Sequence, residues 1–121
     1  MERPLDEPCT VPGGSVTVVE LHGDLDLDTA DMLRDCLEDG VERGTDIVVD
    51  LADVTLIDCV SLGALVEAGR LAERRGHQLC LAAPQPAIRR TLAATMLDKV
   101  FRQYPDRRRA VGGLSAGCAR S

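Results

Sequence analysis

The sequence predicts an α/β protein with a mixed, mostly parallel sheet of four to five strands and helices packed against it. Short apolar segments rich in β-branched residues alternate along the chain with segments whose apolar residues recur at helical spacing. At 121 residues the chain has room for one domain with one core. With one Phe, one Tyr and no Trp, that core is expected to be aliphatic.

Four segments have the composition of strands in a single sheet, and they cover residues 16–21, 47–51, 79–82 and 100–101. The first is followed by a turn at Gly23 and a second short extended piece, which together predict a hairpin-like antiparallel entry into the sheet. We expect residues 53–57 to form a loop-like extension of the second strand.

Three helices are expected between these strands, over about 29–43, 59–75 and 86–95. Asp58 is suited to cap the second helix, and Pro86 is suited to the first turn of the third. Strands that alternate with helices in this way form βαβ units, so most of the sheet should be parallel.

The ends of the chain lack the apolar residues that a packed element needs. Residues 1–14 contain several Pro and Gly, and we interpret them as a flexible leader. The folded domain is expected over 15–111, and residues 112–121 are expected to be a flexible tail, with a weak helix at most after Tyr104.

The charge of the chain is uneven. Residues 1–101 carry 9 basic and 19 acidic side chains, a balance of −10, whereas residues 102–121 carry five Arg and one Asp, a balance of +4. An acidic body repels nucleic acid and favours a basic protein surface. We therefore expect no direct nucleic-acid binding, and we leave open the role of the Arg-rich C-terminal segment.

Composition also disfavours membrane, secreted and metal-binding proteins. No apolar run approaches the roughly 18 residues of a membrane span, and the first residues do not resemble a secretory signal. The five cysteines are scattered without a CxxC pair, and neither His22 nor His77 completes a zinc ligand set. We expect a cytoplasmic protein without metal, cofactor or disulfide framework.

The second predicted helix has an unusual outer face. At 100° per residue, its sheet-facing arc holds Leu62, Leu65, Val66, Gly69 and Ala72. In the N-terminal half of the helix, the side chains of the opposite arc are small and apolar instead of charged. This arc includes Val60, Gly63, Ala64, Glu67 and Leu71. A glycine inside a helix costs about 1 kcal/mol relative to Ala, so this face is predicted to receive a partner's backbone, although incidental surface composition is an alternative.

Two motifs give the chain a family resemblance. Gly23-Asp24-Leu25-Asp26 is similar to the G-E-L-D turn of the STAS domain, and residues 58–63, which read DCVSLG, are similar to its D-S-S-G-L-G loop. Taken in order, these motifs resemble the STAS domain of anti-sigma-factor antagonists over about residues 15–104. Each motif alone is weak, and the ordered set is specific.

The resemblance implies a binding protein and not an enzyme. The implied partner is an anti-sigma factor with a serine-kinase ATPase fold, and the binding of that partner releases a sigma factor. The partner-binding residues that we carry over or infer are Asp24, Asp26, Asp58, Cys59, Val60, Ser61, Gly63, Ala64, Glu67 and Leu71. In the family, the kinase phosphorylates the first Ser of the loop, and the added charge breaks the complex.

The chain departs from the family pattern at the phosphoacceptor. The position holds Cys59, followed by Val60 and then by Ser61 in place of Gly. We therefore expect the usual serine switch to be absent, with Ser61 as a possible substitute acceptor. A thiol at a helix N-terminus also offers a redox alternative, although the charge of adjacent Asp58 opposes formation of the thiolate.

The sequence also allows three other interpretations to be compared with this one. An enzyme would pair Cys59 with His22 or His77, but no third orienting group is evident. A phospho-receiver domain fails because only one helix and one strand separate Asp26 from Asp50. A STAS module that serves as a non-switching subunit of another signalling or transport assembly stays open, as does the oligomeric state.

Overall fold

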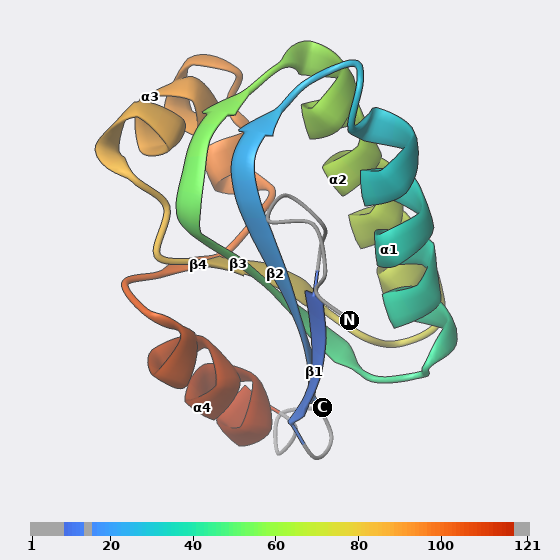
Figure 1. Ribbon diagram of the computed structural model, residues 1–121. Helices are drawn as coiled ribbons and strands as arrows, with labels where there is room; N and C mark the ends of the chain where they lie inside the picture. The colour runs from blue at the N-terminus through green and yellow to red at the C-terminus, as the bar shows by residue number, and fades with distance from the viewer. Residues whose placement is uncertain (1–8, 14–15, 118–121) are drawn as a thin grey trace, which may run out of the picture.

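A single five-stranded sheet forms the centre of the protein, in a computed structural model that describes residues 9–13 and 16–117 (Figure 1). The strands lie in sequence order and are β1 (Cys9–Gly13), β2 (Val16–Leu25), β3 (Asp46–Ile57), β4 (Leu79–Ala82) and β5 (Gln103–Tyr104). β1 is antiparallel to β2, and the other neighbours are parallel. The predicted fold class, a mixed and mostly parallel sheet, is confirmed.

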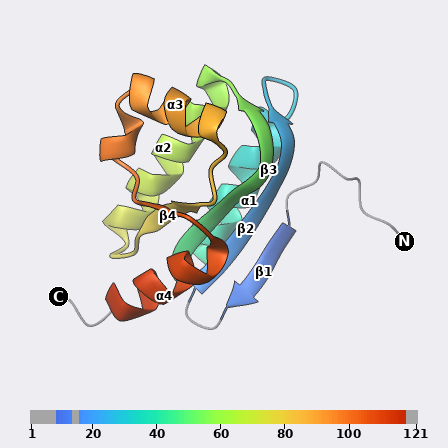
Figure 2. The same cartoon turned by 90° about the vertical axis from the view of Figure 1, so that its left-hand side faces the viewer.

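The helices divide between the two faces of the sheet (Figure 2). They are α1 (Ala30–Glu42), α2 (Cys59–Arg74), α3 (Pro86–Ala94) and α4 (Arg107–Gly117), with a 3₁₀ turn η1 (Leu97–Lys99) after α3. α1, α2 and α3 cover one face because right-handed crossovers between consecutive parallel strands all pass on the same side. The three helices predicted between the strands are confirmed to within one residue at each end.

Two apolar clusters hold these layers together. The larger lies under α1, α2 and α3 and includes Leu21, Leu37, Val49 and Leu65, each at most 2 % exposed. The smaller lies under α4 and includes Val48 and Cys80. Alternate residues of β2 and β3 point into different clusters, as the two-residue period of a strand requires.

β2 and β3 are longer than their sequences predicted. β2 runs through the expected turn, and Gly23 adopts a φ of 73° within it, where the register with β3 shifts. Such bulges let a strand continue while its direction changes, and glycine tolerates the positive φ. The predicted hairpin-like entry at Gly23 and the predicted loop over 53–57 are therefore wrong. The antiparallel pair is instead β1 with β2.

The last strand was predicted at residues 100–101 but lies at β5. The N–H groups of Val100 and Phe101 both donate to the carbonyl of Leu97, which holds this stretch in a turn. Phe101 is buried and lies against Gly69 of α2, where an added β-carbon would be 3.1 Å from the ring. The apolar pair is therefore core packing, and the strand begins after it.

Secondary structure lies within both ends that were expected to be flexible. β1 lies within the expected leader and pairs with β2 along its whole length. α4 extends into the expected tail, and Leu114 is 2 % exposed because it packs against the sheet. The remaining residues of both segments lie outside the described part of the chain. Within that part, no helix is both long and apolar enough to cross a membrane.

Candidate partner-binding site

The N-terminus of α2 is fixed to the end of β2 by the residue that precedes the helix. The Ser61 N–H donates to Asp58 Oδ1 at 2.9 Å, which confirms the predicted cap. The Asp58 N–H donates to the Leu25 carbonyl at 3.0 Å. The loop into α2 is therefore held against the strand that leads into α1.

Three residues of the first turns of α2 face outward. Cys59 is an exposed free thiol, and Val60 is 42 % exposed. Gly63 is exposed one turn further along, and a β-carbon added there would meet nothing within 4 Å. The space over Gly63 is thus open to solvent, as expected for a position that receives a partner.

Ser61 points the other way. Its side chain is 0 % exposed, and its Oγ has no hydrogen-bond partner among the described residues. The hydroxyl is therefore buried without bonding any backbone donor of the described residues. A kinase cannot reach a buried hydroxyl, so the structure also argues against Ser61 as a substitute phosphoacceptor in this conformation.

Ala64 is buried, at 4 % exposed, and so is Ala68 one turn later. The helical period predicts one buried face of α2 toward the sheet, but α1 packs along α2 and creates a second buried side. Ala64 was predicted as a partner contact, and its burial excludes it from the surface. Leu71 is half-buried, because part of its side chain packs against the same core. Glu67 stays exposed and lies 3.9 Å from Arg34 of α1.

The β2–α1 turn lies at the same end of the sheet. In the parallel register Asp24 is opposite Leu56, and the Thr55 hydroxyl donates to Asp24 Oδ1 at 2.7 Å. The Asp26 N–H donates to Thr29 Oγ1 at 3.0 Å. The two predicted motifs are thus brought together because they follow neighbouring parallel strands.

Sequence reasoning missed two exposed leucines at this end. Leu27 is 70 % exposed in the β2–α1 turn, and Leu56 is 52 % exposed near the end of β3. Neither belongs to a periodic pattern, so their exposure could be found only once the bulged end of β2 and β3 was known. With Val60 they add apolar surface at this end, and the turn that holds Leu27 also carries Asp24, Asp26 and Asp28.

A sequence model described as the STAS domain matches residues 10–110, which is most of the chain. The chain belongs to the STAS family. The match includes both the turn at the end of β2 and the loop into α2 that carried the resemblance.

Known STAS proteins resemble the whole domain. The chain is 28 % identical over 91 residues to an anti-sigma F factor antagonist of Paenibacillus polymyxa, covering 74 % of this chain and 78 % of that protein. The crystal structure of an anti-sigma factor antagonist from Mycobacterium paratuberculosis has 27 % identity and a TM-score of 0.82, covering 89 % of this chain and 92 % of that one.

The STAS fold also occurs in transport proteins. The crystal structure of a sulfate transporter family protein from Wolinella succinogenes has 22 % identity and a TM-score of 0.76, covering 88 % of this chain and 89 % of that one. This likeness concerns the fold. The sequence likeness to the Paenibacillus and Mycobacterium proteins makes this chain an antagonist-like STAS domain.

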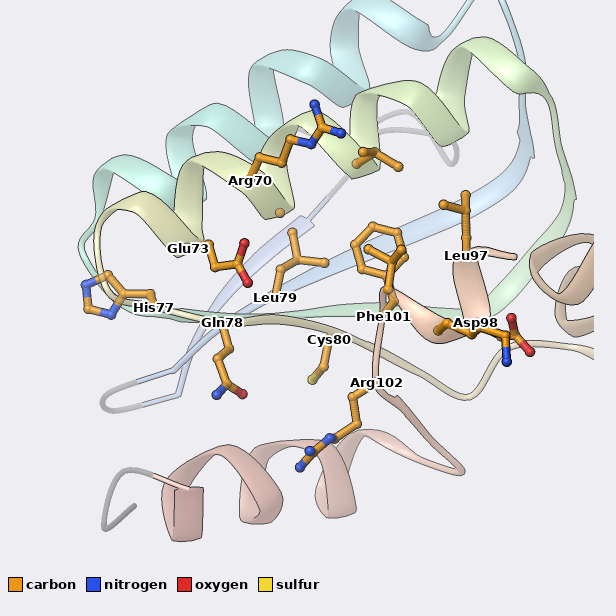
Figure 3. Close-up of a pocket in the computed structure, with 14 residues that line it drawn as sticks. Arg70, Glu73, His77, Gln78, Leu79, Cys80, Leu97, Asp98, Phe101 and Arg102 are labelled. Atoms are coloured by element: carbon orange, nitrogen blue, oxygen red, sulfur yellow. The ribbon is translucent and has the colours of Figure 1, made fainter. Parts of the chain in front are cut away.

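A groove of the described STAS domain lies away from this site. It measures about 720 Å³ and is lined by the C-terminal half of α2, β4 and the segment around η1 (Figure 3). His77 lines it, whereas Cys59 begins α2, about 24 Å away along a 16-residue helix. His22 lies 3.2 Å from Asp53. The structure therefore separates Cys59 from His77, and it gives His22 a carboxylate partner, Asp53.

Proposed function

We propose that this protein is an anti-sigma-factor antagonist that binds an anti-sigma factor of the serine-kinase ATPase fold and thereby releases a sigma factor. It acts by binding and not by catalysis. The docking surface consists of the β2–α1 turn, the loop into α2 and the first exposed turns of α2. The proposal places the protein in the cytoplasm, where sigma factors act.

The observation that carries the proposal is the open first turn of α2. Cys59 and Val60 are exposed there, and nothing lies within 4 Å of a β-carbon added at Gly63. The turn is also rigid, because Asp58 is bonded both to Ser61 and to Leu25. A fixed, uncovered and partly apolar surface is suited to docking with little loss of conformational entropy.

Charge supports a basic partner surface. The acids of the β2–α1 turn, Asp24, Asp26 and Asp28, lie beside exposed Leu27, so the surface has an apolar part and an acidic surround. The described salt bridges involve none of these three carboxylates. A partner with an apolar contact and surrounding Arg or Lys would be electrostatically complementary.

We infer that the docking is not switched by serine phosphorylation. Position 59 carries a thiol in place of a hydroxyl, and the nearest hydroxyl along the helix, that of Ser61, is buried. The protein would then compete with the sigma factor for the anti-sigma factor, and its cellular concentration would set the outcome. Oxidation of exposed Cys59 is a second way to alter the surface without a kinase.

The test is to isolate the native complex with an affinity-tagged chain and to identify its partner by mass spectrometry. The proposal expects an ATPase-fold anti-sigma factor that binds the purified chain directly and that is lost from the complex when Gly63 is replaced by Arg. Recovery of a membrane transporter, or of a signalling complex without an anti-sigma factor, would instead favour a fixed STAS subunit.

A further inference from the structure

α4 covers the face of the sheet opposite the other helices, and few residues hold it there. Among the residues whose burial is described, 16–114, the cluster beneath it contains seven buried residues, against twenty-one in the cluster under α1, α2 and α3. α4 itself contributes Ala110 and Leu114. Its last residues also extend beyond residue 110, where the match to the STAS family ends.

The sequence of α4 is poor for a helix. Gly112 and Gly113 lie in its middle, and glycine is among the least favourable residues there. Arg107, Arg108 and Arg109 occupy its first turn, where the helix dipole favours negative charge. A helix of 11 residues with these defects has little stability of its own, so contacts with the sheet must hold it in place.

The first of these contacts is an ion-pair cluster. Arg107 Nη2 lies 2.9 Å from Asp50 Oδ2, and its Nε donates to the same oxygen at 3.0 Å. The same guanidinium pairs with Glu20. The two carboxylates come from β3 and β2 and are 14 % and 25 % exposed, so the first residue of α4 is joined to two central strands.

The second contact is a close approach in the middle of α4. Tyr104 of β5 lies over Gly113, and a β-carbon added at Gly113 would be 2.5 Å from the Tyr104 hydroxyl oxygen. Nothing lies within 4 Å of a β-carbon added at Gly112. Gly113, although unfavourable for the helix, thus allows α4 to pack on the Tyr104 ring.

We propose that α4 is a strap that opens as a unit while the α1–α3 side of the domain stays folded, and that Arg107 is its latch. Opening breaks the contacts of Arg107 and Tyr104 and uncovers the apolar strip under α4, which consists of Val16, Val18, Val48, Cys80 and Ala82. Segments with few buried contacts are the ones that open below the free energy of global unfolding.

Cys80 reports on this opening. Its thiol is 1 % exposed beneath α4, and Figure 3 shows its side chain and that of Arg102 extending to the α4 side of β4. Burial, and secondarily the charge of Asp46, raises its pKa to about 12, while Arg102 opposes that rise. Cys80 also lines the groove of Figure 3, but it is almost fully buried, so alkylation near neutral pH should be slow while α4 is closed and faster once α4 opens and the thiol is solvated.

The experiment is native-state alkylation of the full chain with iodoacetamide, followed by mass spectrometry of the peptide that contains Cys80. Arg107→Gln removes the latch, and we expect it to speed Cys80 labelling by about tenfold or more. Arg108→Gln is the matched control, because Arg108 is exposed and is in none of the described ion pairs. It should leave the rate unchanged. Gly112→Ala strengthens the helix and should slow labelling several-fold.

Amide exchange of Leu65, in the core under α2, separates local from global opening. Each rate is divided by its rate in the unfolded chain to give a free energy of opening. The proposal expects this free energy to be larger for the Leu65 amide than for the Cys80 thiol in the wild type. Arg107→Gln should lower the value for Leu65 less than the value for Cys80. High salt should speed labelling in the wild type more than in Arg107→Gln, because it screens the latch. Two results would overturn the proposal. One is Cys80 labelling that occurs only through global unfolding in every variant. The other is an equal increase in the labelling rate in Arg107→Gln and Arg108→Gln.

Discussion

The Ser61 N–H donates to Asp58 Oδ1 at 2.9 Å, while the Ser61 hydroxyl has no partner among the described residues. One residue therefore completes the helix cap through its backbone and buries an unused hydroxyl through its side chain. The bond fixes the turn that presents Cys59 and Val60 to solvent. The position that would carry a kinase-accessible hydroxyl in the family thus carries a thiol here, and the serine that is present is inaccessible.

Phosphorylation provides the first prediction. The proposed partner kinase, supplied with ATP, should leave the wild type unmodified, because a thiol is not the substrate of a serine kinase and Ser61 is buried. Cys59→Ser should create a substrate, since Asp58 and the helix N-terminus that would hold a phosphate are in place. Mass spectrometry measures the outcome. Efficient modification of the wild type at Ser61 would show that the first turn of α2 opens.

The buried hydroxyl gives a second prediction. Ser61→Ala should raise the free energy of unfolding by about 1–2 kcal/mol, because it removes a polar group that is buried without a partner. Thr17 is the matched control, since its buried hydroxyl lies 2.7 Å from that of Thr45. Thr17→Ala should lower the same free energy by about 1 kcal/mol. Urea titration compares the two, and destabilisation by Ser61→Ala would mean that the hydroxyl is bonded.

Adjacent glycines of α4 should respond in opposite directions. Gly112→Ala should stabilise by up to about 1 kcal/mol, because the space is open and Ala favours the helix. Gly113→Ala should destabilise by about 1–3 kcal/mol, because the Tyr104 ring must move. Thermal unfolding of the two variants is the measurement. Equal effects would contradict the packing of Tyr104 on the helix.

The buried thiol of Cys80 makes stability depend on alkaline pH. Its folded pKa is about 12, above its ordinary value of 9.0, mainly because burial disfavours the thiolate. As pH rises, the thiol of the unfolded chain therefore loses its proton before the thiol of the folded chain does. The contribution of the buried thiol to the free energy of unfolding is full below pH 9.0 and is lost as pH rises toward 12. Comparison of urea unfolding in the wild type and Cys80→Ala across this range isolates the effect. Parallel pH profiles would contradict a buried thiol.

The sequence was sufficient for elements whose pattern is local. The strands with continuous apolar runs and the cap at Asp58 follow from composition and spacing, and the structure confirms them. The burial of a helix residue by a neighbouring helix, in addition to the sheet, could not be predicted from composition and spacing. Ala64 seemed exposed because the helical period records one buried face, and it is buried because α1 packs on a second face.

The C-terminal end was misjudged for a related reason. Its glycines and arginines are unfavourable for a helix, and local propensity predicted a weak helix at most, followed by a tail from residue 112. Arg107 is instead neutralised by Glu20 and Asp50, which lie 87 and 57 positions earlier in the sequence. Pairings between such distant residues leave no periodic signal, so only the folded arrangement reveals them.

The affinity for the anti-sigma factor tests the central claim most directly. Gly63→Arg places a large cation on the proposed surface without touching the fold, and Glu73→Arg places the same side chain on an exposed position at the other end of α2. Isothermal titration of the purified anti-sigma factor should show a loss of about a hundredfold or more in affinity for Gly63→Arg. It should show a near-unchanged affinity for Glu73→Arg. Wild-type affinity in Gly63→Arg, or an anti-sigma factor that does not bind the unaltered chain, would contradict the account.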